Sequence, residues 1–546
     1  MRGRASPAMP SFASRIDTTS TAFADNRARL LELIAEWRAI EQRTRDASAK
    51  AGPLFERRGQ LLPRERVARL LDPGLPWLEL STLAGWLQDT PDAARSIAGG
   101  GFIAGIGSVA GTRVMLVADD AGIDAGAMQP VGIDKFLRAQ AIALENRLPF
   151  VHLVESAGAN LLAYRVEHFI RGGQLFANLA RLSAAGLPVI SVVHGSSTAG
   201  GAYMTGLADY VVMVRGRGKA FLAGPPLLKA ATGEEASDEE LGGAELHASV
   251  SGLAEYVADN DAEALRITRD LVAVLGFARS EAMLPSGPAP ALDAEELLGL
   301  VPQDSRKPLD MREVVARIVD ASAFLEFKPG YGPATLCGHA AIHGIGVGIA
   351  SNNGPLDPAG STKLTHFIQA CCQSRLPIVY LQNTTGFIVG KDAERAGMIK
   401  HGSKQIQAIA NATVPQLTIH CGASYGAGNY GMCGRGLGPR FAFSWPNART
   451  AVMGPQQAAQ TMAIVMREGA RRKGEPPDEA RLDALQAKIV ATFERQMGAL
   501  YTSGLLLDDG IIDPRDTRDV LGLALSLCAQ AEERVLQKVQ FGVARM

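Results

Sequence analysis

The chain contains one sequence pattern twice, about 227 residues apart, and this duplication limits the possible fold more than any other feature. Each copy has a short apolar run that begins at a proline, at Pro188 in the first copy and at Pro415 in the second. Each run leads into a loop of small residues, Ala199–Tyr203 and then Gly426–Tyr430. A repeat of this length predicts two related domains in one chain, each with one such loop.

The composition excludes several functional classes. Among 546 residues, 47% are hydrophobic and the formal net charge is −1, which does not favour binding to nucleic acid or to a membrane surface. No apolar run reaches the roughly 18–20 residues that span a bilayer. The six cysteines have no CxxC spacing, so we expect reduced thiols in a cytoplasmic protein.

The chain divides into three predicted segments. No acidic residue precedes Asp17, and we expect residues 1–24 to be a disordered N-terminal extension. The stretch Ser280–Leu292 is rich in proline, serine and glycine, which is typical of a linker. We therefore expect an N-terminal domain over 25–290 and a C-terminal domain over 291–546.

Short apolar runs alternate with segments of helical length, which predicts an α/β fold with strands buried on both faces. The predicted strands are Arg113–Ala118, Phe150–Val154, Val189–Val193, Val347–Ala350, Ile378–Leu381 and Gln416–His420. The predicted helices are 25–50, Ile133–Asn146, Val166–Ala184, Lys363–Ser374 and Gly402–Asn411. Both halves show the same alternation, so both should have the same architecture.

The two small-residue loops are the candidate sites. Adjacent glycines at Gly200 and Gly201 let the backbone turn sharply and bring bare N–H groups close to a ligand. If a helix begins there, its first amides have no partner in the helix and can stabilise a developing oxyanion. The alternative is a strand-to-helix turn without a ligand. The corresponding residues of the second copy, Ala427 and Gly428, favour a site over a simple turn, although gene duplication would also copy a structural turn.

No side-chain nucleophile accompanies these loops. The chain has no GxSxG sequence at Ser196 or Ser197, no metal-binding motif and no phosphate-binding loop. We expect His194 and His420, which end repeated strands, to be packed residues, with a general base as the alternative. The pattern therefore favours stabilisation of an enolate by backbone amides over covalent catalysis.

Long motifs outside the loops resemble the crotonase superfamily, and specifically the carboxyltransferase (β) subunits of biotin-dependent acyl-CoA carboxylases. The resemblance extends from about Arg43 to the C-terminus. The matching stretches are Arg57–Arg66, Leu153–Leu161, Ala223–Gly233, Glu239–Ala244, Gln382–Phe387, Tyr425–Arg435, Trp445–Arg449 and Asp508–Thr517.

This resemblance implies two tandem crotonase-like (ClpP/crotonase) spiral domains, with acyl-CoA bound to the N-terminal half and carboxybiotin to the C-terminal half. It also implies a homo-hexameric β core, an α6β6 assembly, and a separate α subunit that carries the biotin carboxylase and biotin carrier functions. Biotin itself would act as the base, which accounts for the missing catalytic side chain. No metal is expected in this subunit, and a mitochondrial location would apply only to a eukaryotic source.

The resemblance also implies roles for individual residues. Gly200 and Gly201 would supply amides for the thioester enolate, and Ala427 and Gly428 those for the biotin ureido oxygen. The candidate cofactor-binding residues are Lys135, Arg138, Ala157, Gly158, Ala159, Lys229, Thr385, Gly386, Phe387, Tyr425 and Gly426. Lys135 and Arg138 are candidates for CoA phosphate contacts, with a solvated helix face as the alternative, and Lys229 is either a CoA contact or an ordinary loop cation.

The substrate prediction depends on residues near the second loop. This chain has Gly436, Leu437 and Gly438 where methylcrotonyl-specific enzymes have Ala-Tyr-Ser, and small residues beside an acyl pocket free volume for a longer isoprenoid tail. Around Tyr203, the sequence also departs from the methylcrotonyl pattern. We therefore expect a geranyl-CoA carboxylase β subunit in acyclic terpene catabolism, with 3-methylcrotonyl-CoA in leucine catabolism as the alternative. A biotin-dependent acyl-CoA decarboxylase subunit and a non-catalytic scaffold paralogue are rivals from other classes.

Overall fold

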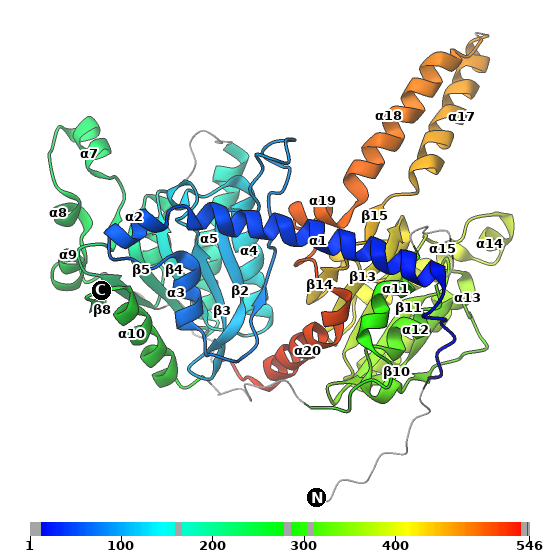
Figure 1. Ribbon diagram of the computed structural model, residues 1–546, viewed down its shortest axis with the longest axis horizontal. Helices are drawn as coiled ribbons and strands as arrows, with labels where there is room; N and C mark the ends of the chain where they lie inside the picture. Colours follow the sequence, from blue (N-terminus) through cyan, green and yellow to red (C-terminus); the bar gives the residue numbers. More distant parts are fainter. Residues whose placement is uncertain are drawn as a thin grey trace, which may run out of the picture. The chain divides into compact units, whose positions relative to one another are not determined.

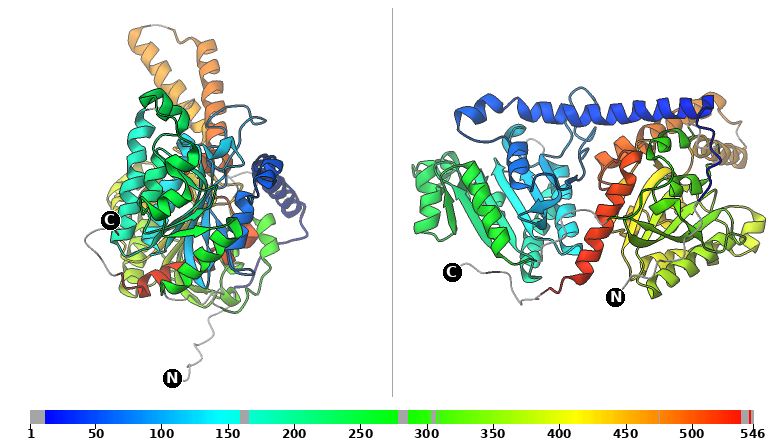
Figure 2. Two further views of the ribbon diagram at one scale, coloured as in Figure 1. Left: turned by 90° about the vertical axis from the view of Figure 1, so that its left-hand side faces the viewer. Right: turned by 60° about the horizontal axis from the view of Figure 1, so that its bottom comes forward.

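The computed structural model describes residues 12–158, 166–277, 286–302, 307, 309–474, 476–536 and 543. The chain forms two compact units, each built around its own sheet (Figures 1 and 2). The N-unit consists of Arg38–Leu284, Gly504–Leu506 and Ser526–Met546. The C-unit consists of Met1–Trp37, Pro285–Ser503 and Leu507–Leu525.

The sheet of the N-unit has the strand order β1-β2-β3-β4-β5-β6-β8, with β7 paired to β5. The first two pairings are antiparallel and the remaining ones are parallel. Its strands are β1 (Leu78–Glu79), β2 (Phe102–Val109), β3 (Thr112–Asp119), β4 (Phe150–Ser156), β5 (Val189–Thr198), β6 (Tyr210–Val214), β7 (Lys219–Phe221) and β8 (Tyr256–Ala258).

The helices with residues in the N-unit cover both faces of this sheet. They are α1 (Thr21–Ala49, shared with the C-unit), α2 (Gly52–Arg57), α3 (Pro63–Leu70), α4 (Pro130–Glu145), α5 (Val166–Ala184), α6 (Gly200–Gly206), α7 (Pro225–Thr232), α8 (Asp238–Gly242), α9 (Ala244–Ser249) and α10 (Asp261–Val274), together with residue 504 and residues 526–533, the ends of two helices that begin in the C-unit. Alternate residues of β4 face two layers: Val151 and Leu153 pack with α3 and α10. Phe150 and His152 instead contact Phe136 of α4, with ring centroids 5.5 and 5.0 Å away.

The C-unit repeats this sheet with the order β14-β13-β12-β11-β10-β9 and with β15 paired to β13. Its strands are β9 (Leu325–Glu326), β10 (Thr335–Ile342), β11 (Ile345–Asn352), β12 (Ile378–Thr384), β13 (Gln416–Tyr425), β14 (Phe441–Ser444) and β15 (Arg449–Ala451). The remaining helices are α11 (Leu297–Leu300), α12 (Met311–Ala316), α13 (Pro358–Gln373), α14 (Lys391–Arg395), α15 (Met398–Ala410), α16 (Ala427–Gly431), α17 (Pro455–Lys473), α18 (Glu479–Met497), α19 (Ala499–Gly504) and α20 (Thr517–Glu533). The prediction of two related α/β domains is confirmed.

The duplication extends to single contacts that the sequence did not reveal. In the N-unit, the carboxylate of Asp72 accepts the N–H groups of Ala110 and Gly111 at the turn between β2 and β3, at 2.9 and 2.7 Å. In the C-unit, Asp320 accepts those of His343 and Gly344 at the turn between β10 and β11, at the same two distances. Each hairpin turn is therefore fixed by one buried or nearly buried carboxylate.

The domain boundaries differ from the linear prediction. Residues 12–24, which the sequence assigned to a disordered extension, have defined partners: Ser14 donates to Glu313 at 2.7 Å, and the N–H of Phe12 to the carbonyl of Ser322 at 3.0 Å. This N-terminal segment belongs to the C-unit, whereas the C-terminal segment 526–546 belongs to the N-unit. A division into consecutive domains cannot represent this exchange of terminal segments.

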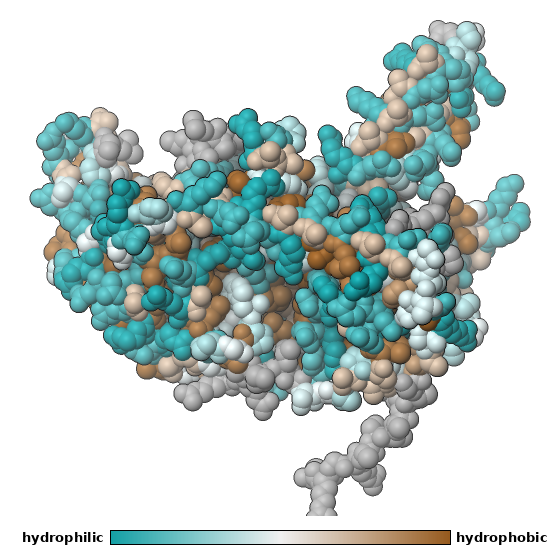
Figure 3. All heavy atoms as spheres, in the orientation of Figure 1, coloured by the Kyte–Doolittle hydropathy of each residue, from teal (hydrophilic) through white to brown (hydrophobic). Residues whose placement is uncertain are grey.

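Helices α17 and α18 form a hairpin that extends from the C-unit (Figure 1). Hydrophobic residues lie among hydrophilic ones along its surface (Figure 3), and Ile464 and Val465 are each 55% exposed. Among the described residues, no helix has the length and the apolar content needed to cross a lipid bilayer.

Candidate active site

The two glycine-rich loops have nearly the same backbone geometry. Strand β5 ends at Thr198, Ala199 then adopts φ 55° and ψ −113°, and α6 begins at Gly200. Strand β13 ends at Tyr425, and Gly426 adopts φ 55° and ψ −148° before α16 begins at Ala427. A single residue with positive φ therefore turns each strand into a short helix, at the carboxyl ends of parallel strands where α/β proteins bind ligands.

The first amides of both helices can serve as donors. Within the described chain, the N–H groups of four residues have no hydrogen-bond acceptor: Gly200, Gly201, Ala427 and Gly428. The first residues of a helix have no carbonyl one turn earlier to which they could donate. Gly200 and Ala427 are exposed, so a ligand oxygen can approach them. Each loop therefore has the donors of an oxyanion site.

A second glycine turn, at the predicted cofactor-binding residues Gly158 and Gly386, lies beside each loop. Gly158, with φ 91°, follows β4, and Gly386, with φ 115°, follows β12. In the C-unit the contact is close, because a Cβ added to Gly428 would lie 2.8 Å from the Cα of Gly386. Ala157 and Thr385 are exposed neighbours of these glycines, and Ala159 lies outside the described residues.

The aromatic residues predicted for the sites differ in their exposure. Tyr203 on α6 is 58% exposed, and its counterpart Tyr430 on α16 is 52% exposed. Tyr425 is only 7% exposed and packs with Ala423 and Met497, and its contact with a ligand stays a prediction. Phe387 packs against the core of the C-unit. Gly426 donates its N–H to the carbonyl of Ala451 at 2.9 Å, so it contributes the turn and not a free donor.

The predicted phosphate contact of Lys135 is contradicted by its burial. Its side chain is 2% exposed, and its ammonium donates to the carbonyls of Phe102 at 2.6 Å and Gly99 at 3.1 Å. Burial lowers the pKa of Lys135 to about 8. Its alternative, a solvated helix face, is wrong as well.

Lys135 instead belongs to a repeated structural contact. Lys363, at the same place on α13, is fully buried and donates to the carbonyl of Thr335 at 2.8 Å. Thr335 begins β10, as Phe102 begins β2. Lys135 therefore joins α4 to the start of β2, and Lys363 joins α13 to the start of β10.

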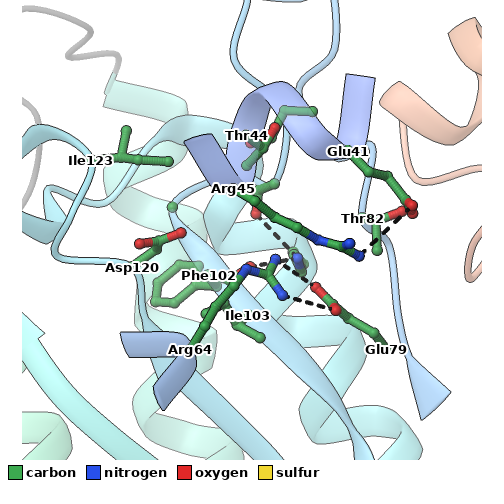
Figure 4. A pocket seen from close by; sticks show the side chains of 14 residues that line it. Glu41, Thr44, Arg45, Arg64, Glu79, Thr82, Phe102, Ile103, Asp120 and Ile123 are labelled. Carbon is green, nitrogen blue, oxygen red and sulfur yellow. Dashed lines mark hydrogen bonds and ion pairs between the residues drawn. The ribbon is translucent and has the colours of Figure 1, made fainter. Parts of the chain in front are cut away.

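Lys135 also lines a small cavity in the N-unit, shown in Figure 4. Arg64 points at Glu79 across this cavity and donates two hydrogen bonds to it, at 2.9 and 3.0 Å. The same arrangement recurs in the C-unit, where Arg312 donates to Glu326 at 2.7 and 2.8 Å. The Arg–Glu pair that lines this cavity is therefore part of the repeated framework.

The other two predicted cations lie nearer the surface. Arg138 is 13% exposed, with its guanidinium 3.5 Å from Glu145. Lys229 on α7 is 64% exposed and pairs with Glu235. Both contacts with CoA stay predictions.

The residues predicted to set the acyl pocket follow α16. A Cβ added to Gly436 or Gly438 would meet no heavy atom within 4 Å, so both face open space. Leu437 points the other way and packs against the core of the C-unit. The role of Gly436 and Gly438 in an acyl pocket stays a prediction.

Neither histidine is placed to act as a base. His194 is fully buried and His420 is 4% exposed, as expected for packed residues. Burial lowers the pKa of His420 to about 4, so the ring is neutral near pH 7. Within the described part of the chain, no group of three His, Cys, Asp or Glu side chains could hold a metal ion.

Comparisons with known proteins agree with this geometry. The family model of the carboxyl transferase domain matches residues 56–541. The biotin-dependent 3-methylcrotonyl-coenzyme A carboxylase β1 subunit of Mycobacterium tuberculosis is 47% identical, over 90% of this chain and 92% of its own length. The mitochondrial methylcrotonoyl-CoA carboxylase β chain of Arabidopsis thaliana is 44% identical, over 97% of this chain and 91% of its own length.

A solved structure gives the same result for the fold. The β subunit of geranyl-CoA carboxylase from P. aeruginosa superimposes with a TM-score of 0.91 at 52% identity, covering 98% of this chain and 100% of that one. The match spans nearly the entire length of both chains. The chain therefore belongs to the carboxyl transferase family, among the β subunits of biotin-dependent acyl-CoA carboxylases.

Proposed function

We propose that this chain transfers a carboxyl group from carboxybiotin, presented by a separate α subunit, to geranyl-CoA. The observation that carries this proposal is the pair of free backbone donors at the start of α6 and again at the start of α16. A carboxyl transfer between two carrier molecules requires charge stabilisation at both, and this chain has one oxyanion site in each unit.

The chain's own groups stabilise charge and position the reactants. The amides of Gly200 and Gly201 bind the thioester oxygen while negative charge develops on it. The amides of Ala427 and Gly428 bind the ureido oxygen of biotin. Carboxybiotin supplies the carboxyl group and the base, so no side chain of this subunit needs to transfer a proton. The loss of one such donor typically reduces the rate about 10²- to 10³-fold.

Three observations support geranyl-CoA as the acyl substrate. The structural relative at 52% identity is a geranyl-CoA carboxylase β subunit. The glycines at 436 and 438 leave open space where larger residues would fill it. The apolar residues Phe169 and Ile170 of α5 are exposed, 68% and 69% respectively, and offer an apolar surface on the unit proposed to bind acyl-CoA. An isoprenoid tail would gain about 0.8 kcal/mol for each buried methylene on such a surface.

The second candidate substrate is 3-methylcrotonyl-CoA. It is favoured by the names of curated relatives at 44% and 47% identity, which cover nearly the whole chain. In both cases we propose a homo-hexameric β core within an α6β6 assembly, with biotin on the α subunit and CoA as part of the substrate. The proposed cellular location is the cytoplasm, or the mitochondrial matrix for a eukaryotic source.

The test is reconstitution of the holoenzyme with its α subunit, followed by kcat/KM for geranyl-CoA and 3-methylcrotonyl-CoA. We expect at least about a tenfold preference for geranyl-CoA, since a few methylene groups in an apolar pocket are worth this much. Gly436→Leu should reduce this preference. Gly469→Leu on α17, also at a glycine that faces open space, is the matched control and should leave it unchanged.

The two substrates give distinct outcomes. Carboxylation of 3-methylcrotonyl-CoA alone would retain the family activity and overturn geranyl-CoA as the substrate. Failure to carboxylate either compound, with a competent α subunit present, would overturn the proposed reaction.

A further inference from the structure

The motif Arg57–Arg66 has no role in the reaction described so far. It lies on α2, α3 and the connection between them, yet two of its side chains reach the carboxyl ends of β4 and β5. Gln60 and Arg66 are 9% and 2% exposed. Both contact Glu155, the residue at which the pairing of β4 with β5 is interrupted.

This interruption is a bulge in β5. Val154 pairs with Val193 and Ser156 pairs with Ser197, so Glu155 lies opposite the whole stretch 194–196. The bulge closes tightly over the carboxylate, because a Cβ on Gly195 would lie 2.5 Å from the Cγ of Glu155. Bulges of this kind redirect a strand and are common beside active sites.

Gln60 and Arg66 stabilise the bulge through hydrogen bonds and an ion pair. The Gln60 amide donates to the carbonyl of His194 at 2.9 Å and to Glu155 at 3.2 Å. The Arg66 guanidinium bridges Glu155 at 2.6 Å and Asp261, at the start of α10, at 2.9 Å. Asp261 in turn accepts from His194 Nδ1 at 2.8 Å. The bulge is thereby joined to α3 and α10 through one buried network.

The protonation states fit this arrangement. Burial, assisted by the charge of Arg66, lowers the pKa of His194, so the ring is neutral and its Nδ1–H donates to Asp261. Burial opposes ionisation of Asp261, but the His194 hydrogen bond and the charge of Arg66 outweigh it and lower the pKa of Asp261 to about 2. Arg66 bridges the carboxylates of Glu155 and Asp261, and a lysine cannot reproduce this planar bridge.

The bulge is connected directly to the loop that carries the amides. Ser197, the first paired residue after it, is hydrogen-bonded to Thr205 of α6 at 3.0 Å. The Ser197 hydroxyl also lies 3.4 Å from the position of a Cβ on Gly201. A shift of the bulge would therefore move the start of α6.

The C-unit has the same bulge, but its described residues form no ion pair at the residue that corresponds to Glu155. Gln382 pairs with His420 and Thr384 with Ser424, which leaves Asn383 in the place of Glu155. The Asn383 amide oxygen accepts the N–H of Ala423 at 3.3 Å, and Gly422 closes over it as Gly195 closes over Glu155. The charged fastening is therefore specific to the unit proposed to bind acyl-CoA.

We propose that Gln60 and Arg66 are positioning residues that hold the β5 bulge, and through it the Gly200 and Gly201 amides, in the geometry that stabilises the thioester enolate. This inference rests on the proposed function of that loop. Neither residue contacts the substrate. Because a misplacement of about 1 Å can reduce a rate about 10²-fold, a loosened bulge lowers turnover even when the acyl-CoA still binds.

The experiment measures kcat and KM for the acyl-CoA in the reconstituted holoenzyme containing Gln60→Met or Arg66→Lys. Gln60→Met keeps the side-chain volume and removes both donated hydrogen bonds. We expect kcat to fall about 10- to 100-fold with little change in KM, the pattern of an interaction that matters in the transition state. Arg66→Lys keeps the positive charge but not the planar bridge, so we expect it to retain a higher kcat than Arg66→Gln.

Arg64→Gln is the matched control. Arg64 belongs to the same motif and has a bidentate carboxylate partner, Glu79, on the far strand β1. We expect its loss to lower the Tm and to leave kcat unchanged. The proposal is overturned if folded Gln60→Met and Arg66→Lys retain the wild-type kcat, or if Arg64→Gln lowers kcat as much as they do. A wild-type holoenzyme without carboxylase activity would instead overturn the proposed function.

Discussion

At the scale of single residues, Ala199 is the most strained position in the site. It adopts φ 55° and ψ −113°, a region that residues with a Cβ rarely enter, whereas its counterpart in the second loop is Gly426 with φ 55°. The strain places the N–H groups of Gly200 and Gly201 at the end of β5. The turn of the first loop is therefore less stable than that of the second, because Ala199 has a Cβ at a position where the second loop has a glycine.

Replacing Ala199 by glycine should therefore stabilise the protein. Relief of the strained backbone is worth about 1–3 kcal/mol and exceeds the added flexibility of glycine in the unfolded chain, for a net gain of about 1 kcal/mol. Urea unfolding measures this gain. Ala202→Gly, in the helical part of α6, is the control and should destabilise by about 0.5–1 kcal/mol. A lower unfolding midpoint for Ala199→Gly would contradict the strain.

The sequence located the turns of the two loops and misassigned Lys135 for a physical reason. Gly200 and Ala427 could be located because small residues after an apolar run mark a sharp strand-to-helix turn. Lys135 was misassigned because a lysine on an amphipathic helix looks the same in sequence whether its ammonium meets solvent or buried carbonyls. Gln60 and Arg66 were part of a recognised motif, but their partners Glu155 and Asp261 are distant in sequence.

At the scale of elements, β13 contains a group that couples stability to pH. His420 is buried, its Nδ1 lies 3.3 Å from the Ser444 hydroxyl, and that hydroxyl donates to Asp508 at 2.6 Å. Burial lowers the pKa of His420 to about 4, and burial raises the pKa of Asp508 to about 6. The two groups act in opposite directions on stability as the pH falls.

His420→Asn should remove one of these contributions. In the unfolded chain His420 gains a proton below about pH 6.5, whereas the folded protein resists protonation until about pH 4. The stability that His420 contributes is present above pH 6.5 and is lost as the pH falls towards 4, by about 3 kcal/mol in total. Urea unfolding at pH 7 and pH 4.5 should therefore show a larger acid loss for the wild type than for His420→Asn.

Asp508 does not affect that comparison, because its opposite contribution, a gain as the pH falls below about 6, occurs in both proteins. Equal acid losses for the wild type and the variant would show that His420 does not resist protonation in the folded state.

The apolar runs of β4, β5, β12 and β13 predicted these strands correctly. Their bulges were not predictable, since they depend on which partner residue each strand meets.

At the scale of the whole molecule, the duplication explains the fold, in which both units have the same framework. Both units have a carboxylate at the hairpin turn, Asp72 or Asp320, and a buried lysine that donates to the carbonyl at the start of a strand, Lys135 or Lys363. The two units therefore share individual contacts as well as the same sheet. The two units exchange terminal segments, so the linear boundary near residue 290 describes only their central parts. Against this common framework, the ionic network of Arg66 lies in the unit that we propose binds acyl-CoA.

The most direct test of the central claim separates the two loops. Gly201→Pro and Ala427→Pro each remove one amide donor in the first turn of a short helix, where proline is tolerated. In the reconstituted holoenzyme, both variants should lose acyl-CoA carboxylation by about 10²-fold or more. Gly201→Ala, which keeps the N–H, is the control.

The decisive measurement is the loss of the carboxyl group from carboxybiotin in the absence of acyl-CoA, in folded variants. The two-site account predicts that Ala427→Pro slows this half-reaction and that Gly201→Pro leaves it at the wild-type rate. Equal rates for both variants, or a slower reaction in Gly201→Pro alone, would contradict the assignment of one loop to each reactant.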